Sequence, residues 1–426
     1  MGPLKERTPV YTRREVLRSL SLLTAGSAFP VTGHKVAARS KASGNRLEAS
    51  GPPHSGSHAA DTPGPTMPVI YTSDLFHPPD FLDDQVDLAT LLALPELDVR
   101  AIVLEQGYRQ HTRSGATPVE QMIALTGRRV PYAVGLAHPL RYPEDKASDA
   151  HPLLQKGVEL IHRALREASS EVFMIVVGSA RDTAAAFNRD EKLFREKVAR
   201  VYLNIGNLPG GDLEWNAALD PQAYLRLMES NLPIYWCPCL GAEGSYELMG
   251  AGKLRIQQHQ TYWMFRQSEL LDALPAPLQN YFLYATGAKD PSSEDPADYL
   301  RRTPDKPLKE RDGAKVREMF STASIIHAAG RQLCRQGDSW QALASPTAEC
   351  RPWPVFDFVP ATVNIDRDLR TPVQISETDG RFRIFHLRDL ENYEAAMRTS
   401  LRQLLAEMKI VLAAGEARGT RSCAAV

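Results

Sequence analysis

The run Val172-Phe-Met-Ile-Val-Val177, followed by Gly178-Ser179, decides how this chain folds. An unbroken apolar run of this length is typical of a parallel strand that is buried on both faces, because a strand with one wet face would alternate. The Gly-Ser pair ends the run, and a helical pattern follows from Arg181 to Asn188. A strand, a tight turn and a helix in this order predict a parallel sheet with helices on both faces.

The same alternation of β-rich runs and helical patterns extends to both sides of this strand. We predict further strands at Val69–Thr72, Val99–Leu104, Val130–Val134, Val201–Ile205 and Leu232–Cys237. Helices are expected at Gln85–Leu94, Pro118–Thr126 and Leu153–Ala168. The predicted fold class is therefore α/β, with a mostly parallel, doubly wound sheet flanked by helices.

Beyond Gly241 the pattern becomes more helical and more aromatic. The segments that carry this pattern are Thr261–Phe265, Pro277–Tyr284 and Val316–Ala329, followed by a strand-like Phe382–Leu387 and a final helix at Leu390–Leu412. No long linker interrupts residues 67–412, so we predict a single domain there.

Composition favours a globular protein with a small-molecule substrate. The chain has 426 residues, of which 43% are hydrophobic and 24% charged, so it can bury a substantial core. Its formal net charge of -1 offers no attraction to a polyanion, and we expect neither nucleic acid nor an anionic membrane as a partner.

The cysteines do not indicate a disulfide scaffold. There are only 5 of them, irregularly spaced, and an odd number leaves at least one unpaired in a monomer. Cys237 and Cys239 would point to the same face of a strand. Packing explains this pair better than metal binding, because no second Cys/His pair stands at zinc-finger spacing.

The first residues are typical of an export signal. Twin arginines, Arg13 and Arg14, precede a short, weakly apolar stretch from Ser19 to Phe29 that is too short to be a permanent membrane anchor. We predict a twin-arginine signal over residues 1–43, a disordered linker over 44–66 and a disordered tail over 413–426; a disordered basic tail is the alternative at the N-terminus. The expected partner is the twin-arginine export machinery, and the expected location is periplasmic or extracellular.

The C-terminal Cys423-Ala-Ala-Val426 fits a prenylation box, but that modification conflicts with such an export signal.

Four carboxylates crowd the segment Asp74-Leu-Phe-His-Pro-Pro-Asp-Phe-Leu-Asp-Asp84, between a predicted strand and a predicted helix. Loops at this position of α/β proteins usually carry the chemistry. Such a cluster repels itself unless a cation compensates. Two interpretations are open from spacing alone: a site for a hard divalent metal with oxygen ligands, or a solvated acidic turn with an Asp N-cap.

Three separated segments resemble one known family. The first contains Asp74, a five-residue insertion with His77-Pro-Pro-Asp80, and Asp83-Asp84 at the start of the predicted helix. The second is Val176–Ala184. The third is Glu214-Trp-Asn-Ala-Ala-Leu-Asp-Pro221. In order and spacing they are similar to the inosine-uridine-preferring nucleoside hydrolases, over roughly residues 68–330. The family's motifs are Asp-x-Asp-Pro-Gly-x-Asp-Asp, a strand with a Gly-rich turn, and Glu-Phe-Asn-x-x-x-Asp-Pro.

The resemblance implies a role for each matching residue. Asp74 would bind calcium and act as the catalytic base for the attacking water, and Asp84 would be a second calcium ligand. The backbone carbonyl of Val177 would be a third. The substrate-binding residues would be Asp83, on the sugar side, with Glu214 and Asn216 hydrogen-bonding ribose hydroxyls.

The chain also departs from the family. Thr72 stands at the earliest Asp of the first motif, and Phe320-Ser321 stand where the family has His-Asp. Serine is a neutral, weaker oxygen ligand, and phenylalanine cannot protonate a leaving base. Asp80, in the insertion, is our hypothesis for the replacement carboxylate.

The sequence thus predicts an exported, calcium-dependent N-glycosidase that hydrolyses a nucleoside or a ribose-like glycoside. The alternative is a non-catalytic sugar- or nucleoside-binding protein that has lost the fourth metal ligand. A third hypothesis is a pocket remade for another glycoside, with Asp80 and His77 in the lost roles. A homo-oligomer is compatible with all three.

Help for the leaving group is unassigned in the sequence. His77 and His327 are candidate proton donors, and Trp215, Tyr262 and Trp263 are candidates for stacking on a ring.

Overall fold

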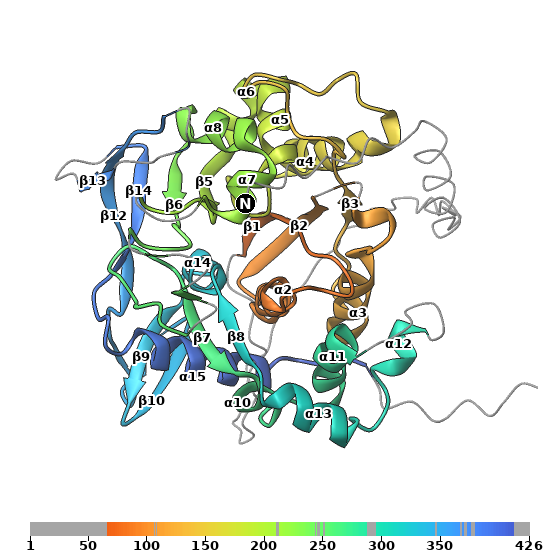
Figure 1. Ribbon diagram of the computed structural model, residues 1–426, viewed down its shortest axis with the longest axis vertical. Helices are drawn as coiled ribbons and strands as arrows, with labels where there is room; N and C mark the ends of the chain where they lie inside the picture. The colour runs from red at the N-terminus through yellow and green to blue at the C-terminus, as the bar shows by residue number, and fades with distance from the viewer. Residues whose placement is uncertain are drawn as a thin grey trace, which may run out of the picture. The chain divides into compact units, whose positions relative to one another are not determined.

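A computed structural model of the chain (Figure 1) describes residues 66–412 except 106, 108, 210–212, 243, 245–247, 250–251, 288–294, 346, 367–368, 370–372 and 376–379. The predicted signal, all but the last residue of the predicted linker, and the predicted tail with Cys423 lie outside the described residues. The described residues belong to one compact unit.

The central sheet of the described residues has 9 strands in the order β13-β12-β14-β6-β5-β4-β1-β2-β3. Their bounds are β1 Met67–Ser73, β2 Leu97–Leu104, β3 Tyr132–Val134, β4 Val172–Val177, β5 Val198–Leu203, β6 Ile234–Trp236, β12 Phe356–Val363, β13 Val373–Ile375 and β14 Phe382–Leu387. Neighbouring strands from β14 to β3 are parallel, and only β12 runs antiparallel to its neighbours. The predicted fold class is therefore confirmed, and the predicted strands are β1 to β6.

The inner strands β1 and β4 are buried on both faces, and their apolar side chains alternate between two hydrophobic cores. In β4, Ile175 packs into the core on one face of the sheet and Met174 into the core on the other. In β1, Tyr71 and Ile70 divide in the same way. Burial on both faces is the physical reason for the continuous apolar run of β4.

Helices cover both faces of the sheet (Figure 1). One core includes residues of α2 (Asp83–Ala93), α3 (Ala116–Thr126) and α15 (Tyr393–Ala406); the other includes residues of α4 (Lys156–Glu167), α5 (Arg181–Arg189) and α8 (Pro221–Glu229). The other described helices are η2 Arg109–His111, η3 Pro152–Gln155, α6 Glu191–Lys197, α7 Trp215–Leu219, α10 Gln267–Leu271, α11 Ala276–Gly287, α12 Pro296–Tyr299, α13 Lys306–Gly313 and α14 Thr322–Ala328. No described helix combines the length and the apolar character that crossing a bilayer requires.

Two segments that the pattern predicted as helical form strands instead. β7 (Trp263–Arg266) and β8 (Val316–Met319) pair in an antiparallel two-stranded sheet. Trp263 and Met319 face each other across the pair and are fully buried. The helix prediction is wrong for these two stretches because pairing between distant stretches overrides a local pattern. It is confirmed in the neighbouring parts of the predicted segments, where α11 (Ala276–Gly287) and α14 (Thr322–Ala328) form.

A small sheet beyond α14 carries a disulfide. β9 (Gln332–Gln336) lies between β10 (Ser339–Leu343) and β11 (Arg351–Pro352), and Cys334 in β9 is bonded to Cys350. Cys237 and Cys239 are free and buried, as expected for packing residues.

Candidate active site

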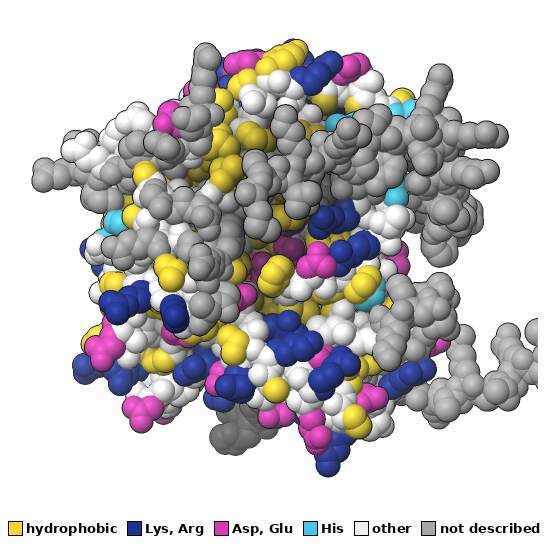
Figure 2. Space-filling view, viewed as in Figure 1, with side chains coloured by type: hydrophobic (Ala, Val, Ile, Leu, Met, Phe, Trp, Pro, Cys, Tyr) yellow, Lys and Arg dark blue, Asp and Glu magenta, His cyan; other side chains and the backbone are white. Residues whose placement is uncertain are grey.

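A pocket of about 480 Å³ lies at the carboxyl ends of the inner parallel strands. Asp74 follows β1, Val177 ends β4 and Asn204 follows β5, so the common strand direction brings them to one edge of the sheet. Figure 2 shows acidic side chains in the hollow near the middle of this face. The other lining residues are Phe76, Pro79, Asp80, Phe81, Asp83, Asp84, Arg109, Glu214, Trp215, Asn216, Cys239, Met249, Glu318, Phe320 and Ser321.

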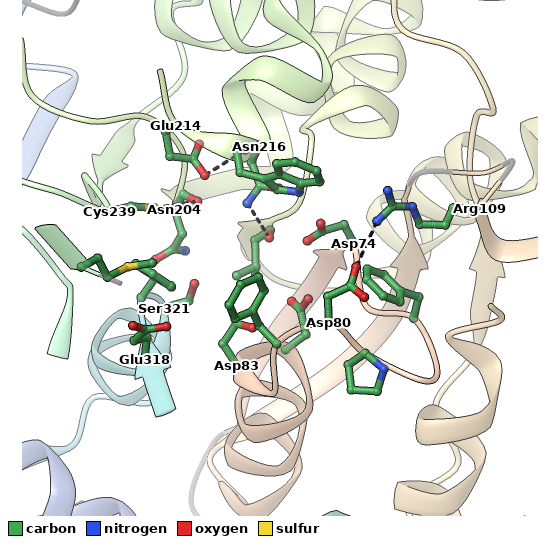
Figure 3. A pocket seen from close by; sticks show the side chains of 18 residues that line it. Asp74, Asp80, Asp83, Arg109, Asn204, Glu214, Asn216, Cys239, Glu318 and Ser321 are labelled. Carbon is green, nitrogen blue, oxygen red and sulfur yellow. Dashed lines mark hydrogen bonds and ion pairs between the residues drawn. The ribbon is translucent and has the colours of Figure 1, made fainter. Parts of the chain in front are cut away.

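All six residues predicted to bind the metal or the substrate line this one pocket (Figure 3). These residues are Asp74, Asp83, Asp84, Val177, Glu214 and Asn216. They come from the three separated segments that resemble the family motifs. The structure brings them together, and their individual roles stay predictions.

The acidic segment is the start of a helix rather than a capped turn. Asp83 and Asp84 lie in the first turn of α2, and the N-cap is Leu82, which makes no side-chain capping bond. The interpretation as a turn with an Asp N-cap is therefore wrong. The two carboxylates lie at the positive end of the helix, which favours anions.

Asp83 and Asp84 hold their protons more tightly than usual. Burial, with a further contribution from the charge of Asp74, raises the pKa of Asp83 to about 7. The same two causes raise the pKa of Asp84 well above its ordinary value, although Ser73 Oγ donates a 2.8 Å hydrogen bond to Asp84 Oδ1. This cluster would ionise fully only with a cation beside it.

Glu214 caps a helix as well as lining the pocket. It is the N-cap of α7, where its carboxylate accepts hydrogen bonds from the backbone N–H groups of Asn216, Ala217 and Gly206 at 2.8, 3.0 and 2.8 Å. Burial raises its pKa to about 7 in spite of these bonds. The residue thus orients the turn that presents Asn216 to the pocket.

Asn216 connects this turn to the end of β4. Its Nδ2 donates to the backbone carbonyl of Val177 at 3.2 Å. Its Oδ1 is buried and has no hydrogen-bond partner among the described residues. A ligand hydroxyl in the pocket would satisfy that oxygen.

The segment that departs from the family motif is tied to α2. Ser321, which is 3% exposed, lines the pocket, and its side chain hydrogen-bonds Asp87. Thr322 Oγ1 donates to the same carboxylate at 2.9 Å. Phe320 also lines the pocket. Thr72, at the other departure, is fully buried, and its Oγ1 has no partner among the described residues.

Asp80 is paired with arginines. Arg113 Nη2 donates to Asp80 Oδ1 at 2.8 Å, and an Arg109 nitrogen lies 3.8 Å from Asp80 Oδ2. The Asp80 side chain is 54% exposed. These contacts speak against the hypothesis that Asp80 replaces the missing metal carboxylate, because its charge is already compensated at the mouth of the pocket.

The candidate proton donors do not line the pocket. His77 stacks on Tyr284 with ring centroids 4.8 Å apart, and burial lowers its pKa to about 4. His327 accepts or donates a 2.8 Å hydrogen bond with Tyr202, and burial lowers its pKa to about 4 as well. Both are neutral packing residues at neutral pH, so a remade pocket that depends on His77 is not supported.

Among the aromatic candidates only Trp215 borders the pocket. It is 50% exposed, and the Arg109 guanidinium lies 5.9 Å from its ring centroid. Tyr262 and Trp263 are buried in the protein.

Sequence reasoning missed Asn204, Arg109 and Glu318. Asn204 was included in a predicted strand, although a polar residue at a strand end is a signal for a site. Glu318 was hidden in a segment predicted as a helix, and Arg109 lies in a short 3-10 helix that no motif marked.

The donor set fits an oxygen-ligated cation. Asp74 and Asp84 are hard oxygen donors whose mutual repulsion a divalent ion would relieve, and the Val177 carbonyl borders the same pocket. Side chains alone do not complete such a site, since no group of 3 or more His, Cys, Asp or Glu side chains is arranged to hold a metal among the described residues. Backbone oxygen and water would have to complete it.

Comparisons with known proteins all show similarity to nucleoside hydrolases. Residues 78–285 match the model of the inosine-uridine preferring nucleoside hydrolase family. A pyrimidine-specific ribonucleoside hydrolase, RihA, of Citrobacter koseri is 28% identical over 189 residues, which cover 39% of this chain and 58% of the relative. The RihA of an Enterobacter species is 26% identical over 188 residues, with the same shares covered. The chain thus spans little more than half the length of these curated relatives.

A solved plant nucleoside hydrolase is 17% identical to this chain, and the alignment covers 80% of this chain and 100% of that chain. The TM-score of 0.49 is too low for this structural similarity to strengthen the family match.

Proposed function

We propose that this chain, an inosine-uridine nucleoside hydrolase-like family member, is an N-glycosidase that hydrolyses the bond between base and sugar in a nucleoside or ribose-like glycoside. The observation that carries the proposal is the gathering of Asp74, Asp84, Glu214 and Asn216 in one pocket. Carboxylates and an unpaired amide oxygen around one cavity suit a substrate with several hydroxyl groups.

The proposed chemistry assigns water activation to Asp74. Breaking an N-glycosidic bond leaves positive charge on the sugar ring in the transition state, and nearby carboxylates stabilise that charge. Asp74, which is 7% exposed, accepts the proton of the water that attacks the anomeric carbon. Asp83, Glu214 and Asn216 hold the sugar hydroxyls, with the free Oδ1 of Asn216 as one acceptor.

We also propose that the family's metal requirement is met here by Ca²⁺. Asp74, Asp84 and the Val177 carbonyl would hold the ion, which supplies positive charge for sugar hydroxyls and lowers the pKa of water. The raised pKa values of the acidic cluster support this assignment.

The test is base release by the purified protein with Ca²⁺ and a panel of ribonucleosides. We expect turnover, and we expect Asp74→Ala and Asp84→Ala each to lose it by about 100-fold or more. Thermal melting of each variant checks that the fold survives. Protein that binds no divalent ion and releases no base from any nucleoside would refute the proposal.

A second candidate function is binding without catalysis. Ser321 is neutral and hydrogen-bonded to Asp87, and Phe320 has no proton to give, so two groups of the family's machinery are absent. Saturable heat on nucleoside titration without product would favour the binder. Measurable turnover would eliminate it.

We propose that the protein is exported by its twin-arginine signal to the periplasm or the extracellular space. The Cys334–Cys350 disulfide supports this, because disulfides persist mainly in oxidising compartments. Fractionation of cells that express the full chain tests it. We expect Arg13→Lys with Arg14→Lys to retain the protein in the cytoplasm, and unchanged export of that variant would contradict the proposal.

A further inference from the structure

Glu318 is a carboxylate of the pocket that the proposed chemistry leaves without a role. It lies in β8, where Met264 of β7 is its antiparallel partner. Strand alternation turns Met319 into the core, while Glu318 and Phe320 on the other side both line the pocket. β8 therefore contributes a carboxyl group to the pocket. That group comes from Glu318, two residues before Phe320, which stands where the family has a histidine.

The surroundings of Glu318 leave its carboxyl group available. It is half-buried and forms no hydrogen bond or ion pair with another described residue. The charged and titratable groups that face it are Arg317 on its own strand, Asp83 on α2 and Tyr262 just before β7. Burial raises its pKa and Arg317 opposes that effect only in part, so the neutral acid is more populated than for an exposed glutamate.

Glu318 lies across the pocket from Asp74. Figure 3 shows Glu318 and Ser321 on one side of the cavity and Asp74 on the other, and all three line it. When water displaces a leaving group at a sugar carbon, the two occupy opposite sides of that carbon. An acid for the leaving group is therefore expected opposite the base that activates the water.

We propose that Glu318 is the general acid that protonates the departing base, a role that rests on the proposed N-glycosidase function. The bond from the anomeric carbon to the base nitrogen breaks with its electron pair going to the base, which takes the proton of Glu318. The oxygen of water forms the new bond to the anomeric carbon, and Asp74 takes the water proton. Release of that proton and reprotonation of Glu318 restore the site, so one water is consumed for each free base and sugar.

This assignment also defines a substrate class. The enzyme acts on nucleosides whose base departs only when protonated on a ring nitrogen or oxygen. A glycoside with a leaving group that is stable as an anion needs no acid.

The experiment compares two substrates in the full-length protein with Ca²⁺: a ribonucleoside, such as uridine or inosine, and para-nitrophenyl β-ribofuranoside. We expect Glu318→Gln to lower kcat on the ribonucleoside by about 100-fold or more while changing kcat on the nitrophenyl riboside by less than about threefold. The alkaline decline of kcat on the ribonucleoside, where the acid form is lost, should disappear in this variant. Glu394→Gln is the matched control, since Glu394 is also half-buried with a raised pKa but lies outside the pocket, and we expect no change on either substrate.

Two results would overturn the inference in different ways. If the wild-type protein cleaves both substrates and Glu318→Gln loses both equally, or loses neither, the acid role fails while the N-glycosidase function stands. If the wild-type protein cleaves neither substrate, both proposals fail together. An unchanged melting temperature of Glu318→Gln excludes unfolding as the cause of any loss.

Discussion

Asp83 couples the protonation of the pocket to the stability of the fold. Its pKa of about 7 in the folded protein lies above its ordinary value of 3.8, so the folded state binds the proton more tightly than the unfolded state. The unfolding free energy of metal-free protein should therefore fall as the pH rises from about 4 to 7. Denaturant unfolding along this pH series measures the slope, which Asp83→Asn should reduce. An identical slope in both proteins would contradict this prediction.

Asn216 allows ligand binding to be separated from folding. Replacing it with alanine removes the free Oδ1 but also the bond from Nδ2 to the Val177 carbonyl. We expect KM for a ribonucleoside to rise about tenfold, the effect of one lost hydrogen bond to a buried group, with little change in melting temperature. Steady-state kinetics measure KM, and an unchanged KM would show that Asn216 does not bind the sugar.

Local sequence identified many of the site residues but not their partners. Asp74, Asp84 and Asn216 stand in recognisable motifs, at the end of a strand or the start of a helix. The pairing of Asp80 with Arg113 joins positions 33 residues apart, and no local pattern encodes it. In the sequence Asp80 therefore appeared to be an unpaired carboxylate, whereas in the structure its charge is paired with arginines.

At the scale of elements, a buried ion pair fixes α5 against the start of α8. Arg181 Nε lies 2.9 Å from Asp220 Oδ2, both side chains are buried, and Asp220 is also the N-cap of α8. Arg181→Met would leave a buried carboxylate unpaired, and we expect it to lower the unfolding free energy by about 3 kcal/mol.

Arg166→Met is the control for this change, because Arg166 lies 3.6 Å from Asp190 in an exposed pair. We expect less than about 0.5 kcal/mol there, since surface pairs contribute little. Denaturant unfolding measures both losses of unfolding free energy. Equal losses would show that the buried pair stabilises the fold no more than the exposed pair does.

The disulfide stabilises the small sheet of β9, β10 and β11. It joins positions separated by 16 residues, and a cross-link of that length stabilises a fold by about 3 kcal/mol through the unfolded chain. Cys334→Ser with Cys350→Ser should lower the melting temperature accordingly, and reduction of the wild-type protein should lower it by a similar amount. No change on reduction would contradict the prediction.

Prediction of elements succeeded where the pattern is determined locally. β4 was predicted with its observed bounds, because burial on both faces forces an unbroken apolar run. The strands β7 and β8 were missed because they pair with each other across about 50 residues. A periodicity pattern read over about 11 to 18 residues does not include such a distant partner.

At the scale of the whole molecule, the pocket connects three elements that a bound cation would hold together. Asp74 follows β1, Asp84 begins α2 and Val177 ends β4. A ligand that binds only the folded state stabilises it by about 2.7 kcal/mol at 100 times its Kd. We therefore expect EGTA to lower the melting temperature and added Ca²⁺ to restore it. The same addition should do little for Asp84→Asn, and a Ca²⁺ response of equal size in that variant would place the ion elsewhere.

The sequence by itself determined the parallel sheet, because its apolar runs and helical patterns follow from burial on two faces. It also determined which acids and which amide stand in the motifs at the strand end and the helix starts. Only the tertiary structure decided which groups meet. It paired β7 with β8 and so brought Glu318 into the pocket opposite Asp74, compensated Asp80 with arginines, and packed His77 against Tyr284. These contacts join residues far apart in the chain, and their free energies depend on burial and distance that no local stretch of sequence contains.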